Sequence, residues 1–162
     1  MDKDYIKSLG YRALDSRLKR ISDRITHDIR KLYKEMDLDI EPGWYLLLRL
    51  LKENKQLTIV QIAEQLNYAH PTVVVIIKKM VTKGYVVAER DTEDKRKQLI
   101  SMTEKAKEAL PGMEKIWQSC DRAIFQVLEE DETILKYLDV IDEALKTSSF
   151  YDRFKNELND KD

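Results

Sequence analysis

The sequence contains few of the residues that carry metal, redox or catalytic chemistry. Its 162 residues include 1 Cys, 2 His, 3 Pro and 4 Gly. One Cys excludes an intrachain disulfide and a zinc site built from several thiolates. The sequence also lacks a Gly-rich phosphate loop, a Ser-His-Asp set and paired catalytic carboxylates. We therefore expect no enzyme activity, no catalytic residue, no metal site and no cofactor.

Long apolar runs are missing as well. No stretch approaches the ~20 consecutive apolar residues that span a bilayer, and the charged start of the chain is not that of a signal peptide. A chain of this length buries about two thirds of its unfolded surface, so it needs no disulfide or metal to fold. We expect a single-domain cytoplasmic protein that does not interact with a membrane.

The net charge is nearly zero, but the charges are unevenly distributed. The formal net charge of the whole chain is −1. Residues 1–103 contain 20 Lys and Arg against 15 Asp and Glu, whereas residues 104–162 contain 9 against 15. Charge per segment indicates partners better than the total does. The first segment is suited to a polyanion, although charge runs also occur on faces that are simply solvated.

Both ends of the chain show helical periodicity. Apolar residues recur at steps of three and four through residues 14–36, and similar stripes run through 110–127 and 134–145. Polar and charged residues fill the gaps, which is typical of amphipathic helices with one apolar face. Residues 44–53 are nearly apolar all round and predict a buried helix.

The segment that follows predicts a helix-turn-helix. Thr58 precedes a short apolar-periodic run, and Gln61 follows three residues later, which is the spacing of a capping box. After a break at residues 67–69, a second helix is expected over 70–83, ended by Gly84 in the left-handed conformation. Two short helices joined by so tight a turn form a helix-turn-helix.

A β-hairpin is predicted next. Residues 85–90 and 97–102 have the composition of short strands, and the charged, turn-forming segment 91–96 lies between them. Thr103 is expected to cap the following helix. A helix-turn-helix followed by a hairpin is a winged helix. The predicted fold class is therefore mainly α with a small β-hairpin wing, in which long N- and C-terminal helices flank a winged helix-turn-helix core.

These elements carry motifs with a family resemblance. The motifs are Leu57-Thr58-Ile59-x-x-Ile62-Ala63, Pro71-Thr72-Val73, Lys83-Gly84-Tyr85-Val86, Asp91-x-x-Asp94-x-Arg96 and Ser101-Met102-Thr103-Glu104-Lys105. Together they resemble the core of MarR-family transcriptional regulators. The resemblance implies one domain over 1–162, with dimerisation helices in 1–37 and 104–162 and a DNA-binding core in 42–103.

The resemblance also implies a function. Members of this family are sequence-specific double-stranded DNA-binding transcriptional regulators, so we expect a homodimer that binds a near-palindromic operator and represses until a small aromatic or lipophilic effector binds. Trp44, Tyr45 and Trp117 are candidates for an effector pocket, and plain core packing is the alternative for these aromatics. Cys120 lies in an apolar stripe, where a thiol usually acts as a small hydrophobe and not as a redox sensor.

In relatives, the second helix of the helix-turn-helix lies in the major groove. The residues of this helix expected at DNA are His70, Pro71, Thr72, Val74, Val75, Lys78 and Lys79. Relatives usually have polar side chains where this chain has Val74 and Val75. The two valines either contact thymine methyl groups or rest against the sugar-phosphate wall. His70 and Thr72 become the main polar readers, and the helix N-terminus is expected to hold a phosphate.

The predicted wing adds further candidates. Arg96 is placed to enter the minor groove, where narrow A·T stretches concentrate negative potential. Lys95 and Lys97 are expected at flanking phosphates, and the resemblance implies that Asp94 orients Arg96 without touching DNA. The alternative for the wing is a solvated hairpin with an ordinary surface ion pair. For the whole chain, the alternative is a winged-helix protein–protein interaction module without specific DNA binding, which the two valines and the modest charge favour.

Overall fold

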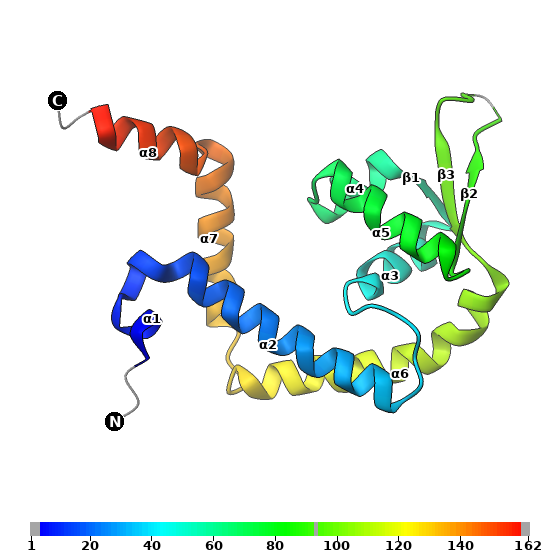
Figure 1. Ribbon diagram of the computed structural model, residues 1–162, viewed down its shortest axis with the longest axis horizontal. Coiled ribbons are helices and arrows are strands. Elements are labelled where there is room, and N and C mark those ends of the chain that lie inside the picture. The colour runs from blue at the N-terminus through cyan, green and yellow to red at the C-terminus, as the bar shows by residue number, and fades with distance from the viewer. Residues whose placement is uncertain (1–3, 93, 160–162) are drawn as a thin grey trace. The chain divides into compact units, whose positions relative to one another are not determined.

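The structure is a computed structural model that describes residues 4–92 and 94–159. It is mainly helical with one small antiparallel sheet (Figure 1), which confirms the predicted fold class. The helices are α1 (Tyr5–Ser8), the 3-10 turn η1 (Gly10–Ala13), α2 (Leu14–Glu35), α3 (Trp44–Asn54), α4 (Ile59–Leu66), α5 (His70–Thr82), α6 (Glu104–Val127), α7 (Thr133–Thr147) and α8 (Phe150–Asn159). The strands are β1 (Gln56–Thr58), β2 (Val86–Arg90) and β3 (Gln98–Met102). The chain divides into two compact units, one ending at Lys115 and the other beginning at Ile116.

The predicted capping box starts α4. The Thr58 hydroxyl oxygen accepts a hydrogen bond from the Gln61 backbone N–H at 3.2 Å, and the Gln61 side-chain oxygen accepts one from the Thr58 N–H at 2.8 Å. The two bonds satisfy backbone donors that a helix leaves unpaired at its start. At the other end, Asn67 has φ of 51° and closes α4 in the left-handed conformation that Asn tolerates.

Helix α5 follows after a short turn and lies beside α4 (Figure 1). Its end is confirmed as predicted, because Gly84 has φ of +73°, a conformation that strains any L side chain. The Gly84 N–H bonds to the Val81 carbonyl and the Tyr85 N–H to the Met80 carbonyl, both at 2.9 Å. The chain therefore turns sharply from α5 into β2.

The sheet has the strand order β1-β3-β2, with both pairs antiparallel. In the hairpin, Val86 lies opposite Met102 and Arg90 opposite Gln98, so β2 and β3 are paired along their whole length. Strand β1 joins the other edge of β3, with Leu57 opposite Ile100. The sequence predicts β2 and β3 but not β1.

The core of the first unit lies between α3, the helix-turn-helix and the sheet. Its most deeply buried side chains are Leu47, Leu48, Leu51, Ile62, Val73, Met80, Val86, Ile100 and Met113. The all-round apolar segment predicted to be a buried helix is α3, which confirms that interpretation. Helix α5 packs through Val73, Ile77 and Met80, whereas Val81 is 41% exposed. This packing determines which face of α5 is exposed.

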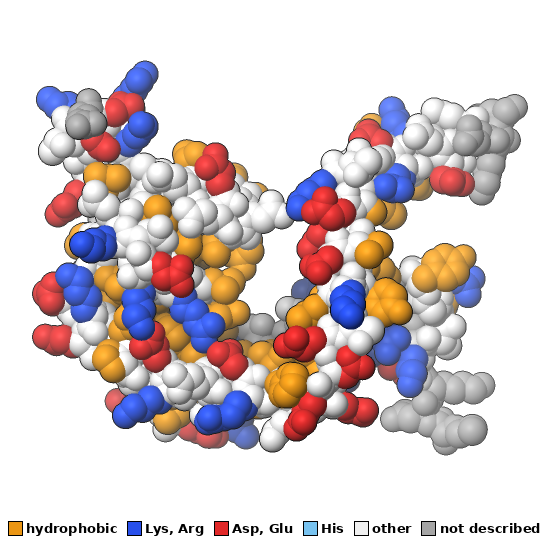
Figure 2. All heavy atoms as spheres, turned by 180° about the vertical axis from the view of Figure 1, so that it is seen from behind, with side chains coloured by type: hydrophobic (Ala, Val, Ile, Leu, Met, Phe, Trp, Pro, Cys, Tyr) orange, Lys and Arg blue, Asp and Glu red, His pale blue; other side chains and the backbone are white. Residues whose placement is uncertain are grey.

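The second unit contains the end of α6 together with α7 and α8. Neither α7 nor α8 has a buried residue among those described. Apolar side chains of α7 lie uncovered between charged ones in Figure 2. The exposed apolar residues of the two helices are Ile134, Leu135, Tyr137, Val140, Leu145, Phe150, Tyr151, Phe154 and Leu158. Both helices are thus amphipathic with an apolar face that this unit does not cover.

Replacing Thr58 with Ala removes the side-chain acceptor at the start of α4. We expect the free energy of unfolding to fall by about 1 kcal/mol, the usual cost of losing such a cap. Urea denaturation should show a lower midpoint with an unchanged slope. Thr58→Ser keeps the hydroxyl and should stay close to the wild type, and equal stability of the Ala and Ser variants would contradict the role of the cap.

Candidate nucleic-acid interface

The exposed face of α5 presents the residues predicted from the sequence. His70, Pro71 and Thr72 in the first turn are exposed, and Val75, one turn further on, is 53% exposed. Val74 is half-buried, so the two valines are not equivalent. The outer surface of this helix is therefore polar at its start and apolar in its middle.

Two lysines extend this face toward the end of α5. Lys78 and Lys79 are both exposed. Among the described residues, no ion pair involves either ammonium group. Long lysine side chains of this kind reach phosphates on either side of a groove. The two lysines are therefore available for phosphate contacts.

The loop of the wing is held by its own backbone and by one side chain. The Asp91 N–H donates to the Lys97 carbonyl at 3.1 Å, and the Lys97 N–H donates to the Asp94 carbonyl at 2.8 Å. The Asp94 N–H donates to the Asp91 carboxylate at 3.2 Å. These bonds close the hairpin and fix the position of Asp94 at its tip.

Asp94 in turn holds Arg96. Its Oδ1 accepts hydrogen bonds from the Arg96 backbone N–H at 3.1 Å and from the Arg96 Nε at 3.2 Å. The Lys97 Nζ lies 3.9 Å from the other carboxylate oxygen. The Arg96 side chain is nevertheless 92% exposed, whereas that of Asp94 is 30% exposed. The contact therefore orients the guanidinium group without burying it.

The contacts with Arg96 also affect the pKa of the Asp94 carboxyl group. The pKa of Asp94 is lowered, first by the Arg96 side-chain hydrogen bond and then by the Arg96 backbone N–H. A carboxylate whose pKa falls on folding stabilises the fold above the unfolded titration range and loses that effect as the pH drops through the folded value. Asp94 is thus ionised in the neutral range and remains a fixed acceptor for Arg96.

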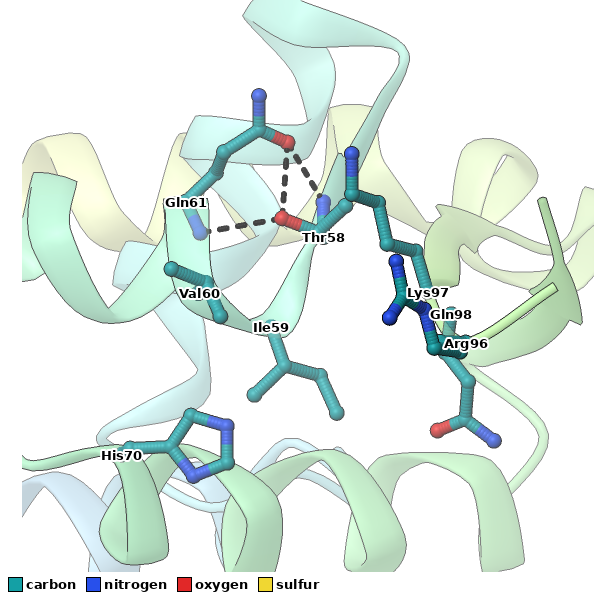
Figure 3. Close-up of a pocket in the computed structure, with 8 residues that line it drawn as sticks. All are labelled: Thr58, Ile59, Val60, Gln61, His70, Arg96, Lys97 and Gln98. Atoms are coloured by element: carbon teal, nitrogen blue, oxygen red, sulfur yellow. Dashed lines mark hydrogen bonds between the residues drawn. The ribbon is translucent and has the colours of Figure 1, made fainter. Parts of the chain in front are cut away.

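A cavity of about 440 Å³ lies between the start of α4, the start of α5 and the wing. Figure 3 shows His70 on one side, Arg96, Lys97 and Gln98 on another, and the Thr58–Gln61 segment on the third. His70, Arg96 and Lys97 are thus brought together from two elements far apart in the sequence. Lys95 is exposed but does not line this cavity.

Several residues that line this cavity are not predicted from the sequence. Ile59, Val60, Gln61 and Gln98 contribute to its wall, and Val60 is 54% exposed. The capping-box spacing identifies Gln61 as a structural residue but gives no sign of its place in the wall of this cavity. Nothing in the local pattern indicates Val60 or Gln98, because their position depends on the pairing of β1 with β3.

The aromatic candidates for an effector pocket occupy different surroundings. Trp44 is 3% exposed and packs edge-on against Tyr85, with ring centroids 5.8 Å apart. Tyr45 is half-buried, with the Arg49 guanidinium carbon 5.5 Å from its ring centroid. Trp117, in the second unit, is 2% exposed. The deep burial of both tryptophans is what core packing requires, and the effector role of the three stays a prediction.

Other chemistry is weakly represented. Burial raises the pKa of the Cys120 thiol, and nearby Asp121 raises it further, which disfavours the reactive thiolate. Within residues 4–92 and 94–159, no group of three or more His, Cys, Asp or Glu side chains is arranged to hold a metal ion. In the same part of the chain, no helix combines the length and the apolar character needed to span a bilayer.

Comparisons with known proteins match this architecture. A sequence model of the MarR family matches residues 38–97. The organic hydroperoxide resistance transcriptional regulator of Bacillus subtilis (strain 168) is 36% identical over 81 residues, or 49% of this chain and 55% of that protein. The chain thus spans about half the length of this curated relative.

Solved structures extend the likeness to most of the chain. The structure of reduced AbfR bound to DNA has a TM-score of 0.68 at 20% identity and covers 91% of this chain and 98% of its own. The transcriptional repressor CouR, bound to a 23-mer DNA duplex, has a TM-score of 0.66 at 22% identity and covers 80% and 92%. At this identity, the similarity shows the fold.

The structure combines a capped α4, a turn at Asn67, an exposed face on α5 and a paired hairpin. Together these elements define a winged helix-turn-helix protein. The MarR-family model matches this part of the chain, residues 38–97, which is therefore similar to that family. The resemblance inferred from the sequence motifs is confirmed.

Replacing Arg96 with Ala removes the largest of the contributions that lower the pKa of Asp94. We expect that pKa to rise, although the backbone N–H of residue 96 still donates to the carboxylate. Carbon-13 NMR titration of the aspartate carboxyl groups measures the change. Lys95→Ala, next to Arg96 in the loop, should leave the pKa of Asp94 where it is. An unchanged value in the Arg96 variant would show that the guanidinium does not hold Asp94 in solution.

Proposed function

We propose that this protein is a sequence-specific, double-stranded DNA-binding transcriptional regulator. The observation that carries the proposal is the Asp94-held Arg96 on the wing beside the exposed first turn of α5. Two such elements are what a winged helix presents to DNA, one to the major groove and one to the minor groove. The predicted contact residues His70, Thr72, Lys78, Lys79, Lys95 and Lys97 supply polar and cationic groups around them.

The relatives support DNA over protein as the partner. The Bacillus subtilis relative is named a transcriptional regulator, and AbfR and CouR were solved on DNA. CouR is a transcriptional repressor, which favours repression for this chain as well. We accordingly place the protein with the chromosome in the cytoplasm, without an enzyme activity. The protein-binding alternative has no comparable support.

We further propose that the protein acts as a homodimer. Helices α2, α7 and α8 present apolar faces that are not covered within their own units, with Leu14, Leu18 and Ile21 of α2 at 38–44% exposure. The acidic excess of residues 104–162 complements the basic excess of residues 1–103. A two-fold dimer places two recognition helices about 34–36 Å apart, one DNA turn, and so selects a near-palindromic operator.

Regulation by a small aromatic or lipophilic effector is the remaining part of the proposal. An effector that binds one dimer arrangement better than another shifts the population toward it. If that arrangement has the wrong spacing of recognition helices, the operator is released. Trp44, Tyr45 and Trp117 remain the candidate effector contacts, with 1–37 and 104–162 as dimerisation segments and 42–103 as the DNA-binding core.

Replacing Arg96 with Ala should weaken DNA binding without unfolding the protein. Because one cation is lost from the interface, the slope of log affinity against log salt should become shallower by about 0.9. Fluorescence anisotropy with a duplex from the region upstream of the gene, at several salt concentrations, measures both quantities. Lys136→Ala, an exposed lysine of α7, is the matched control and should change neither. Unchanged affinity and slope in a folded Arg96 variant would refute the role of the wing.

Val75 allows the two interpretations of the apolar face of α5 to be separated. If Val75 contacts a thymine methyl group, Val75→Ala should weaken binding about fourfold, the value of one buried methylene-sized contact. The loss should vanish on a duplex in which deoxyuridine replaces thymidine, since uracil lacks that methyl group. An equal loss on both duplexes would assign Val75 to the sugar-phosphate wall instead.

A further inference from the structure

We propose that DNA binding by this protein is coupled to protonation of His70, whose imidazolium binds a backbone phosphodiester in the cavity that Arg96 and Lys97 also line. The inference rests on the proposed DNA-binding function and adds a regulation to it, an affinity that rises as the pH falls. It assigns the cavity at the start of α5 to a phosphate of the DNA backbone.

His70 lies where it can contact a phosphate in the cavity. It is the first residue of α5, is exposed, and forms one side of the cavity of about 440 Å³. In Figure 3 its ring faces the space between Ile59 and the wing residues. His70, Arg96 and Lys97 are all exposed, so a phosphate of a docked duplex has access to them.

A phosphate in this cavity needs hydrogen-bond donors. A helix start normally offers backbone N–H groups to an anion. Here Pro71 has no N–H, and the N–H groups of Thr72 and Val73 donate to the Ala69 carbonyl at 2.9 and 3.3 Å. Pro71, Thr72 and Val73 therefore offer no free backbone N–H to an anion. Side chains can supply donors in their place, and His70 is the side chain of α5 that lines the cavity.

The other charged side chains that line the cavity are cations. The wing contributes two cations to the cavity, Arg96 and Lys97, and α4 contributes the uncharged Thr58, Ile59, Val60 and Gln61. Asp94 holds the Arg96 Nε and lies near Lys97, so its carboxylate is directed to the wing. A proton on His70 thus adds a positive charge to a cavity that two other cations line.

A phosphate bound in this cavity favours the protonated imidazole, because an anion attracts a further positive charge. By linkage, phosphate binding then takes up a proton, and affinity falls as the pH rises through the range in which imidazole titrates, about pH 5 to 8. The coupling follows from the three groups sharing one cavity.

The test compares three proteins at two pH values. Wild type, His70→Asn and His27→Asn are titrated onto an upstream duplex and onto a random duplex of equal length, at pH 6 and pH 8 and constant ionic strength, in buffers without phosphate. His27 lies on α2 and is the other histidine of the chain, so its variant is the matched control. Thermal melts at both pH values confirm that each protein is folded.

We expect wild type and His27→Asn to bind about five- to tenfold tighter at pH 6 than at pH 8, with a salt slope steeper by about 0.9. His70→Asn should lose both differences. The gain should be equal on the two duplexes, because a backbone phosphate is independent of sequence. Calorimetry of the wild type in buffers of different ionisation enthalpy should detect proton uptake on binding, even if the Asn variant does not fold.

The results that would refute the proposed function differ from those that would refute only the coupling to protonation. Absence of binding to either duplex at low salt and both pH values would refute the proposed function itself. Binding without pH dependence or proton uptake would refute only the coupling. A pH dependence that survives in His70→Asn and disappears in His27→Asn would move the effect to α2. A gain confined to the upstream duplex would mean that His70 reads a base, which overturns the phosphate assignment.

Discussion

Burial of one apolar stripe of α5 is the constraint on which the rest of the interface depends. Val73, Ile77 and Met80 are at most 3% exposed, and they pack against a core to which α3 contributes Leu47, Leu48 and Leu51. Core packing of this density allows a helix little rotation. Once these three residues are inside, the 3.6-residue period turns His70, Thr72 and Val75 outward.

The wing depends on a different principle, since its residues are exposed and gain little from packing. Its backbone bonds between Asp91, Asp94 and Lys97 close the loop, and the carboxylate of Asp94 then accepts two donors from Arg96. Exposed ion pairs contribute little to stability. The consequence of this contact is orientation: it restricts the directions that a long, almost fully exposed side chain adopts before it meets a partner.

Local signals in the sequence were enough to predict the helix-turn-helix and the hairpin. The Thr58 and Gln61 pair, the break at Asn67 and the Gly84 terminator each act within a few residues, so the chain displays them directly. Strand β1 was missed because it is three residues long and exists through its pairing with β3, more than 40 residues away. The terminal helix α8 was not delimited, although Ser149 and Asp152 have the spacing of a helix cap and the Asp152 N–H donates to the Ser149 hydroxyl oxygen at 3.1 Å.

The candidate site shows the same difference between local and long-range contacts. Arg96 and Asp94 are two residues apart, so their contact lies within reach of a sequence motif. The meeting of His70 with Arg96 and Lys97 needs the sheet to bring the wing beside the start of α5, and no local pattern contains that information.

A single sequence feature, His70-Pro71 at the start of α5, gives this interface its particular chemistry. Proline fixes the backbone for a first helical turn while it removes a donor. The loss leaves a side chain to perform what a backbone amide would otherwise do. An amide binds an anion at any pH, whereas an imidazole does so best when protonated. With an imidazole as the donor in place of a backbone N–H, the contact with the phosphate therefore depends on pH.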